Sequence, residues 1–131
     1  MSWMKPKTFA VLAACLTTAA LLGGSLGIAV AGTRQSLSVG FNLVGGPLQA
    51  DVPPAQFVGC IPASSWSAIY VWDGASQSWQ HYFNPTTVPA YVNSSGVGGI
   101  SSIHKFSGVV LLMNQAVASP KLKDSPGESC S

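Results

Sequence analysis

The chain has 131 residues, 8% of them charged, and a formal net charge of +2 at pH 7. Its length fits a single domain, and its charged fraction is far below the roughly 25% of an ordinary soluble protein. Two of the six basic residues, Lys5 and Lys7, precede a long uncharged segment, so the remaining four balance the four acidic residues. A neutral domain without a basic cluster has no charge with which to bind phosphate, which argues against nucleic-acid binding.

Residues 1–31 have the three parts of an export signal. Two lysines give a positive start, residues 9–22 are almost wholly apolar, and Ala29 and Ala31 occupy the small-residue positions of a cleavage site. The uncharged run is also long enough to span a bilayer, which needs about 20 apolar residues, so an uncleaved anchor remains an alternative. Both interpretations predict a secreted or extracytoplasmic domain, which is membrane-anchored through residues 1–31 if the signal is retained.

Strand patterns begin directly after the export segment. Residues 36–44 alternate between apolar and polar side chains, which predicts a half-buried strand. The side chains expected on its core face are Leu37, Val39, Phe41 and Leu43. Residues 68–72 and 79–83 are rich in β-branched and aromatic side chains and flank turn-forming residues, which predicts a β-hairpin.

The second half of the chain predicts two further strands. Residues 88–92 fit a short edge strand, and the consecutive apolar residues 109–113 fit a central strand buried on both faces. We therefore expect an all-β domain over residues 32–118, a small antiparallel sandwich or barrel of about five to seven strands after an N-terminal signal or anchor helix. Residues 119–131 are rich in Pro, Lys, Asp, Gly and Ser, and predict a disordered tail.

Cysteine usage agrees with an oxidising compartment. Removal of the export segment takes Cys15 with it and leaves Cys60 and Cys130, an even pair that predicts a disulfide. A bridge that closes a loop of about 70 residues stabilises the fold by about 4 kcal/mol in the chain-entropy model. Two unpaired thiols are the alternative.

Three short motifs occur in chain order: Gly40-Phe41-Asn42-Leu43-Val44 before Pro47, Val71-Trp72-Asp73 with Trp79, and Gly108 leading into the apolar strand that ends at Met113. They resemble a small β module of bacterial secreted and cell-surface proteins. That module typically opens with Gly-Trp-Asn-Leu-Val/Ile and closes with Gly-x-Gly-Tyr-Trp-Ile, whereas Phe41 replaces the opening Trp here, and Val109 and Val110 replace the closing aromatics. The resemblance covers about residues 37–113 and implies a non-catalytic accessory module on the cell surface, with no ligand named.

No combination of residues points to catalysis or to a metal. The two histidines, His81 and His104, do not stand at metal-ligand spacing from each other or from a cysteine. A Ser-His-Asp triad needs one of them beside Asp51 or Asp73, and nothing local directs that arrangement. We therefore predict no catalytic, cofactor-binding or metal-binding residue, and no enzymatic activity.

The aromatic residues of the hairpin are the candidate ligand contacts: Tyr70, Trp72, Trp79 and Tyr82. If Ile69 and Val71 face the core, Tyr70 and Trp72 point outward, where aromatic side chains stack on sugars or anchor a protein. The residue types favour a structural alternative, in which Trp72 and Trp79 pack across the strands and stabilise the hairpin by about 0.5–1 kcal/mol.

The predicted function is that of a non-enzymatic extracellular or cell-surface β module, with carbohydrate or a protein as the expected partner of the hairpin aromatics. Two alternatives remain open. One is a small secreted hydrolase with an unrecognised site. The other is a self-assembling surface or filament subunit, which the low charge and the apolar run at residues 109–113 favour.

Overall fold

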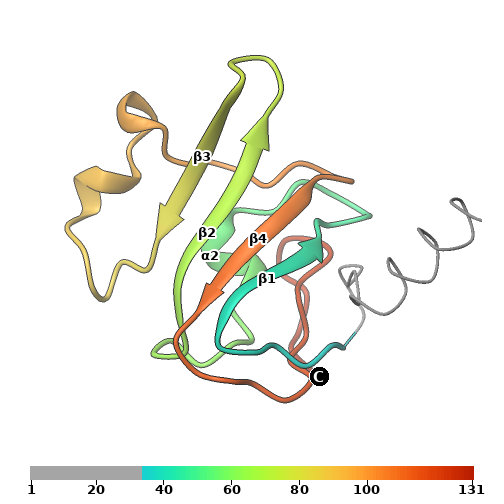
Figure 1. The fold of residues 1–131 in the computed structure, drawn as a ribbon. Coiled ribbons are helices and arrows are strands. Elements are labelled where there is room, and N and C mark those ends of the chain that lie inside the picture. The colour runs from blue at the N-terminus through green and yellow to red at the C-terminus, as the bar shows by residue number, and fades with distance from the viewer. Residues whose placement is uncertain (1–33) are drawn as a thin grey trace, which may run out of the picture.

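The structure, a computed structural model, describes residues 34–131 and contains one antiparallel sheet of four strands in the order β1-β4-β2-β3 (Figure 1). The strands are β1 (Gly40–Gly45), β2 (Trp66–Asp73), β3 (Ser78–Phe83) and β4 (Gly108–Met113). The helical elements are short, namely α2 (Pro54–Phe57) and the 3-10 turns η2 (Ala90–Asn93) and η3 (Ser95–Val97). The all-β prediction is confirmed at this level.

The predicted signal or anchor at residues 1–31 lies outside the described residues. From residue 34 onward, no helix combines the length and the apolar character that crossing a membrane requires.

The β2–β3 hairpin forms as predicted, because its turn residues satisfy their own backbone. The Asp73 carboxylate accepts hydrogen bonds from the Ala75 N–H at 3.1 Å and from the Ser76 hydroxyl at 2.6 Å. Such an Asx-type turn is typical of Asp at the start of a loop. β2 also pairs with β4, so β4 is an interior strand of the sheet.

The segment at residues 88–92 does not form the predicted edge strand. It lies in and around η2, where the Asn93 side chain takes the place of a neighbouring strand. Its amide oxygen accepts the Phe83 N–H at 2.7 Å, and its amide nitrogen donates to the Phe83 carbonyl at 2.8 Å. Residues 98–100 continue this cover, with His81 bonded to Gly98 and to Ile100. Together they close the outer edge of β3, whereas within residues 34–131 β1 has β4 as its only strand partner.

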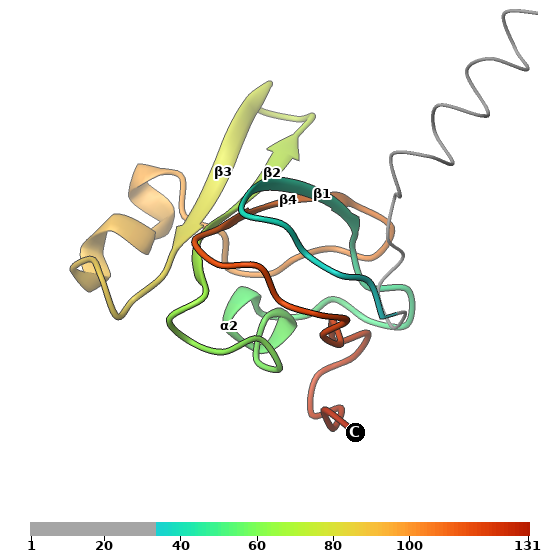
Figure 2. The same cartoon turned by 60° about the horizontal axis from the view of Figure 1, so that its bottom comes forward.

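The hydrophobic core lies on one side of the sheet, where α2 and the C-terminal segment cover it (Figure 2). The buried side chains of the sheet include Val44, Ile69, Val109, Leu111 and Met113, and the covering segments add Val52, Phe57, Ile103 and Leu122. The described part of the chain holds a single sheet, so the expected sandwich or barrel of five to seven strands is not formed within it.

The first strand presents its apolar side chains to the opposite side from the one predicted. Leu37 is buried, but Val39, Phe41 and Leu43 are 66%, 71% and 53% exposed. Leu37 pairs with Val117 and Gly40 with Met113. A step of three residues along the first segment is therefore matched to a step of four along its partner. A one-residue offset of this kind transfers a whole set of side chains to the other face of a sheet.

A turn at Gly40 accommodates this offset. Gly40 has a φ of +95°, which L side chains rarely adopt, and the Asn42 amide donates to the carbonyls of Ser38 and Gly40 at 2.8 and 3.1 Å.

The interior strand β4 is fully buried on one of its two faces. Val109, Leu111 and Met113 are buried, whereas Val110 and Leu112 are half-buried, so the prediction of burial on both faces is wrong.

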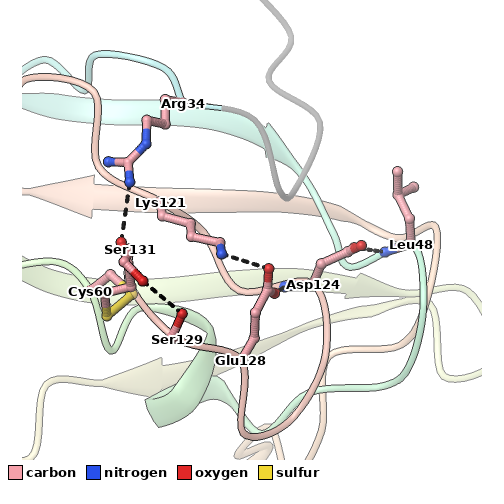
Figure 3. Close-up of polar contacts among 9 residues, drawn as sticks. Arg34, Leu48, Cys60, Lys121, Asp124, Glu128, Ser129 and Ser131 are labelled. Carbon is pink, nitrogen blue, oxygen red and sulfur yellow. Dashed lines mark hydrogen bonds and ion pairs between the residues drawn. A yellow bond between two sulfur atoms is a disulfide. The ribbon is translucent and has the colours of Figure 1, made fainter.

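Residues 119–131 are packed against the domain, in contrast to the predicted disordered tail. Leu122 is buried in the core, and the Asp124 carboxylate, itself largely buried, accepts a hydrogen bond from the Leu48 N–H (Figure 3). The backbone of Lys123 donates to the Phe57 carbonyl at 3.2 Å. The polar composition that suggests disorder is satisfied here by tertiary hydrogen bonds.

Three further links hold the end of this segment. Cys60 and Cys130 form the predicted disulfide, with their Cα atoms 5.4 Å apart. Lys121 and Glu128 form an ion pair of 2.7 Å, and the Arg34 guanidinium donates to the Cys130 carbonyl at 3.1 Å (Figure 3). Residues 119–131, which we name the lid, therefore cover the core, and the bond from Arg34 joins them to the N-terminal end of the described chain.

Replacement of both Cys60 and Cys130 by Ser will lower the free energy of unfolding by about 4 kcal/mol, since the bridge closes a long loop. Chemical denaturation under oxidising conditions measures this change. Ser129→Ala is the control, because its hydroxyl bonds to that of Ser131 at the exposed end of the chain. A double variant as stable as the parent would show that the lid does not depend on the bridge.

Candidate functional site

The side of the sheet opposite α2 carries apolar and aromatic side chains from all four strands, and we name it the open face. Its cross-strand rows are Phe41–Leu112–Ala68–Phe83, then Leu43–Val110–Tyr70–His81, and finally the pair Trp72–Trp79. Phe41, Leu43, Trp72 and Trp79 are between 47% and 71% exposed. Within residues 34–131, no second layer covers these side chains.

Ring contacts hold the aromatic side chains of the open face in place. Trp72 and Trp79 meet edge to face with ring centroids 5.4 Å apart, and Tyr70 meets Phe83 in the same manner at 6.3 Å. Phe41 of β1 lies 6.4 Å from Tyr70 across β4. Edge-to-face pairs at such distances are worth about 0.5–1.5 kcal/mol beyond the area that they bury.

A shallow groove of about 340 Å³ runs across this face. It is lined by one side chain from each strand, namely Phe41 of β1, Val110 of β4, Tyr70 of β2 and Trp79 of β3. Its walls are almost wholly apolar, and its volume is at the lower end of the range for small-ligand sites. The open face contains no Asp, Glu, Lys or Arg, so contact with an apolar surface buries no charge there.

Three of the four candidate aromatics lie together on the open face, and the fourth does not. Tyr70, Trp72 and Trp79 share the face, whereas Tyr82 points to the other side and stacks on Trp66 at 6.1 Å. Tyr82 and Trp66 line a second cavity of about 180 Å³ beside α2. A strand has a side-chain period of two, so Tyr82 cannot share a face with its neighbours His81 and Phe83.

Trp72 and Trp79 also pack across the strands, as the structural alternative for these two residues predicts. Trp72 and Trp79 are cross-strand partners in contact, yet each leaves about half of its surface exposed, at 47% and 55%. Packing within the hairpin and contact with a ligand are therefore compatible.

Sequence reasoning missed the contribution of β1 and β4 to the open face. Phe41 and Leu43 were expected to be in the core, and Val110 and Leu112 were expected to be covered. The one available signal was the run of consecutive apolar residues in β4, which indicates that both sides of the sheet are apolar.

Of the His–Asp combinations that a catalytic triad would need, His104 and Asp51 are in contact. His104 Nδ1 lies 2.8 Å from Asp51 Oδ2, and the Lys105 N–H donates to the same carboxylate at 2.9 Å. Both side chains are largely exposed, and no Ser or Thr hydroxyl within residues 34–131 bonds to the His104 ring. The pair has two members of a triad without the nucleophile.

His81 has a different environment. Its Nε2 lies 2.6 Å from the Val92 carbonyl, which ties the ring to η2. Among the residues that the structure describes, His, Cys, Asp and Glu form no group of three that could hold a metal ion.

Two hydrogen bonds lower the pKa of Asp51 from its ordinary value of 3.8, the larger effect coming from His104 and the smaller from the Lys105 N–H. The folded pKa is below the unfolded one, so this contribution to stability is present above about pH 3.8 and is lost as the pH falls through the folded pKa. Carboxyl NMR titration will show the pKa of Asp51 rising toward 3.8 in His104→Ala. Glu128, whose pKa is lowered chiefly by Lys121, serves as the internal control. An unchanged pKa of Asp51 would contradict the pairing.

Comparison with known protein families, with curated protein sequences and with solved structures finds no match to this chain. The resemblance of the opening motif to a bacterial surface module stays a prediction.

Proposed function

We propose that the protein is a non-enzymatic binding module of the extracytoplasmic space and that its partner contacts the open face. The observation that supports this proposal most strongly is the gathering of Phe41, Leu43, Trp72 and Trp79, all about half or more exposed, around one apolar groove. Soluble proteins rarely expose contiguous apolar patches beyond a few hundred Å² unless the patch is a binding surface.

The chemistry of the groove favours an apolar protein surface over a soluble sugar. Sugar recognition combines ring stacking with hydrogen bonds to hydroxyl groups, and a site for it carries several well-placed polar side chains. The lining side chains carry two polar groups, the Tyr70 hydroxyl and the Trp79 indole N–H, and the surface that they form with Phe41 and Val110 is almost wholly apolar. Aromatic anchors of this kind are typical of protein contacts. Carbohydrate is the second candidate, favoured by the exposed rings.

The extracytoplasmic location is part of the proposal. The Cys60–Cys130 disulfide supports it, because such bridges persist in oxidising compartments and are rare in the cytosol. The export pattern of residues 1–31 supports it independently.

Binding can be tested on a glycan array and on immobilised cell-surface proteins, with variants matched by exposure. Trp79→Ser will reduce binding at least about tenfold, because it removes an aromatic anchor worth about 2 kcal/mol or more. Tyr91→Ser will leave binding unchanged, since Tyr91 is 71% exposed on η2, outside the sheet.

Leu43→Ser provides a second measurement that does not disturb the tryptophan pair. Circular dichroism establishes that each variant is folded. Binding that survives both Trp79→Ser and Leu43→Ser would overturn the assignment of the open face as the contact surface.

A further inference from the structure

We propose that the open face is the contact between two copies of this chain, which stack sheet on sheet to form a two-layer sandwich. This inference rests on the proposed binding role of the open face and names its partner. Two packed sheets lie about 10 Å apart, with interdigitated side chains between them.

The sheet has the composition of an inner layer. The row Leu43–Val110–Tyr70 at the centre of the open face is apolar or aromatic, as is the row Phe41–Leu112–Ala68 beside it. A sheet that is apolar on both faces is covered on both in known architectures. Residues 34–131 supply a cover for one face, and a second copy supplies an identical apolar face for the other.

The charge distribution permits this stacking. The open face has no ionisable acid, lysine or arginine, and His81, at its β3 edge, has its Nε2 engaged by the Val92 carbonyl. Residues 34–131 carry four basic and four acidic side chains, so two copies do not repel each other through net charge. Face-to-face contact thus avoids the cost of burying an unpaired charge.

The shape of the face is compatible with two-fold symmetry. The groove crosses all four strands, with Phe41 of β1 and Trp79 of β3 at its two ends and Val110 and Tyr70 between them. A two-fold axis parallel to the strands places β1 of each copy over the β2–β3 hairpin of the other. Equal rows of the two copies then face each other, so Phe41 of one copy meets Phe83 of the second, Leu43 meets His81, and each contact occurs twice. Trp72 and Trp79 of each copy lie over the row of Gly45 and Gly108, where the second copy has no side chains.

The available area predicts a weak dimer. Phe41, Trp72 and Trp79 each offer on the order of 100 Å², given the roughly 150–250 Å² that an aromatic residue buries in full. With Leu43 and the half-buried neighbours, the face buries roughly 500 Å² per copy. The total of roughly 1,000 Å² is at the lower limit for a specific interface, so we expect a weak dimer whose population depends on concentration.

Sedimentation velocity over a concentration series tests the inference on the protein as isolated from the cells that make it, after mass spectrometry of the product. The sedimentation coefficient will rise from that of a monomer to that of a dimer. Leu43→Lys, which places an ammonium group in the interface, will weaken association at least about tenfold. Val97→Lys is the matched control, because Val97 is 54% exposed on η3, outside the sheet, and Leu43 is 53% exposed.

Fluorine NMR with fluorotryptophan identifies the surface used. The signals of Trp72 and Trp79 will shift with concentration, whereas that of the buried Trp66 will not. Association that survives Leu43→Lys, or that leaves Trp72 and Trp79 unshifted, would overturn the inference, because the copies would then meet through another surface such as the edge of β1.

Other outcomes separate this inference from the proposed function. A protein that stays monomeric but binds a glycan, a surface protein or phosphatidylcholine vesicles through Trp79 would overturn the dimer and leave the open face as a binding site. A monomer that binds none of these would overturn both.

Discussion

Leu37 and Gly40 lie three residues apart, whereas their partners Val117 and Met113 lie four residues apart, and this mismatch decides which side of the sheet the side chains of β1 face. Before the offset, Leu37 points into the core, and after it, Phe41 and Leu43 point away. Gly40 makes the offset possible, because its φ of +95° is accessible without strain only to glycine. Asn42 then satisfies the backbone of the turn.

The core lies between the sheet and segments outside the strands. The sheet covers it from one side, and the other side is made of short segments with little regular structure of their own, α2 and residues 119–131 among them (Figure 2). Such segments gain little from helix or sheet formation, so their order comes from tertiary contacts. The disulfide joins the lid to Cys60, shortly after α2, and the bond from Arg34 to the Cys130 carbonyl joins it to the N-terminal end of the described chain.

The aromatic rings of the open face contact one another. Trp72 contacts Trp79, and Tyr70 contacts both Phe41 and Phe83, so these rings are held in the free protein. Side chains that are ordered before binding lose less conformational entropy when a partner arrives. In the function that we propose, hairpin stabilisation and partner binding use the same side chains, and the proposed dimer extends their contacts into a second layer.

The sequence by itself determined the local features. Alternating and consecutive apolar residues predicted the positions of β1 and β4, the turn residues at 73–78 predicted the β2–β3 hairpin, and the even cysteine pair predicted the disulfide. The strands and the hairpin follow from the side-chain period of a strand and from turn chemistry, which act over a few residues. The disulfide was predicted from the cysteine count.

Only the tertiary structure decided which side of each strand is inside. A period of two defines two faces but does not say which is covered, because that depends on segments far away in the chain. This is why Phe41 and Tyr82 lie on the sides opposite to those expected, and why residues 119–131 are packed. The contact between Asp51 and His104, which are 53 residues apart, has the same origin.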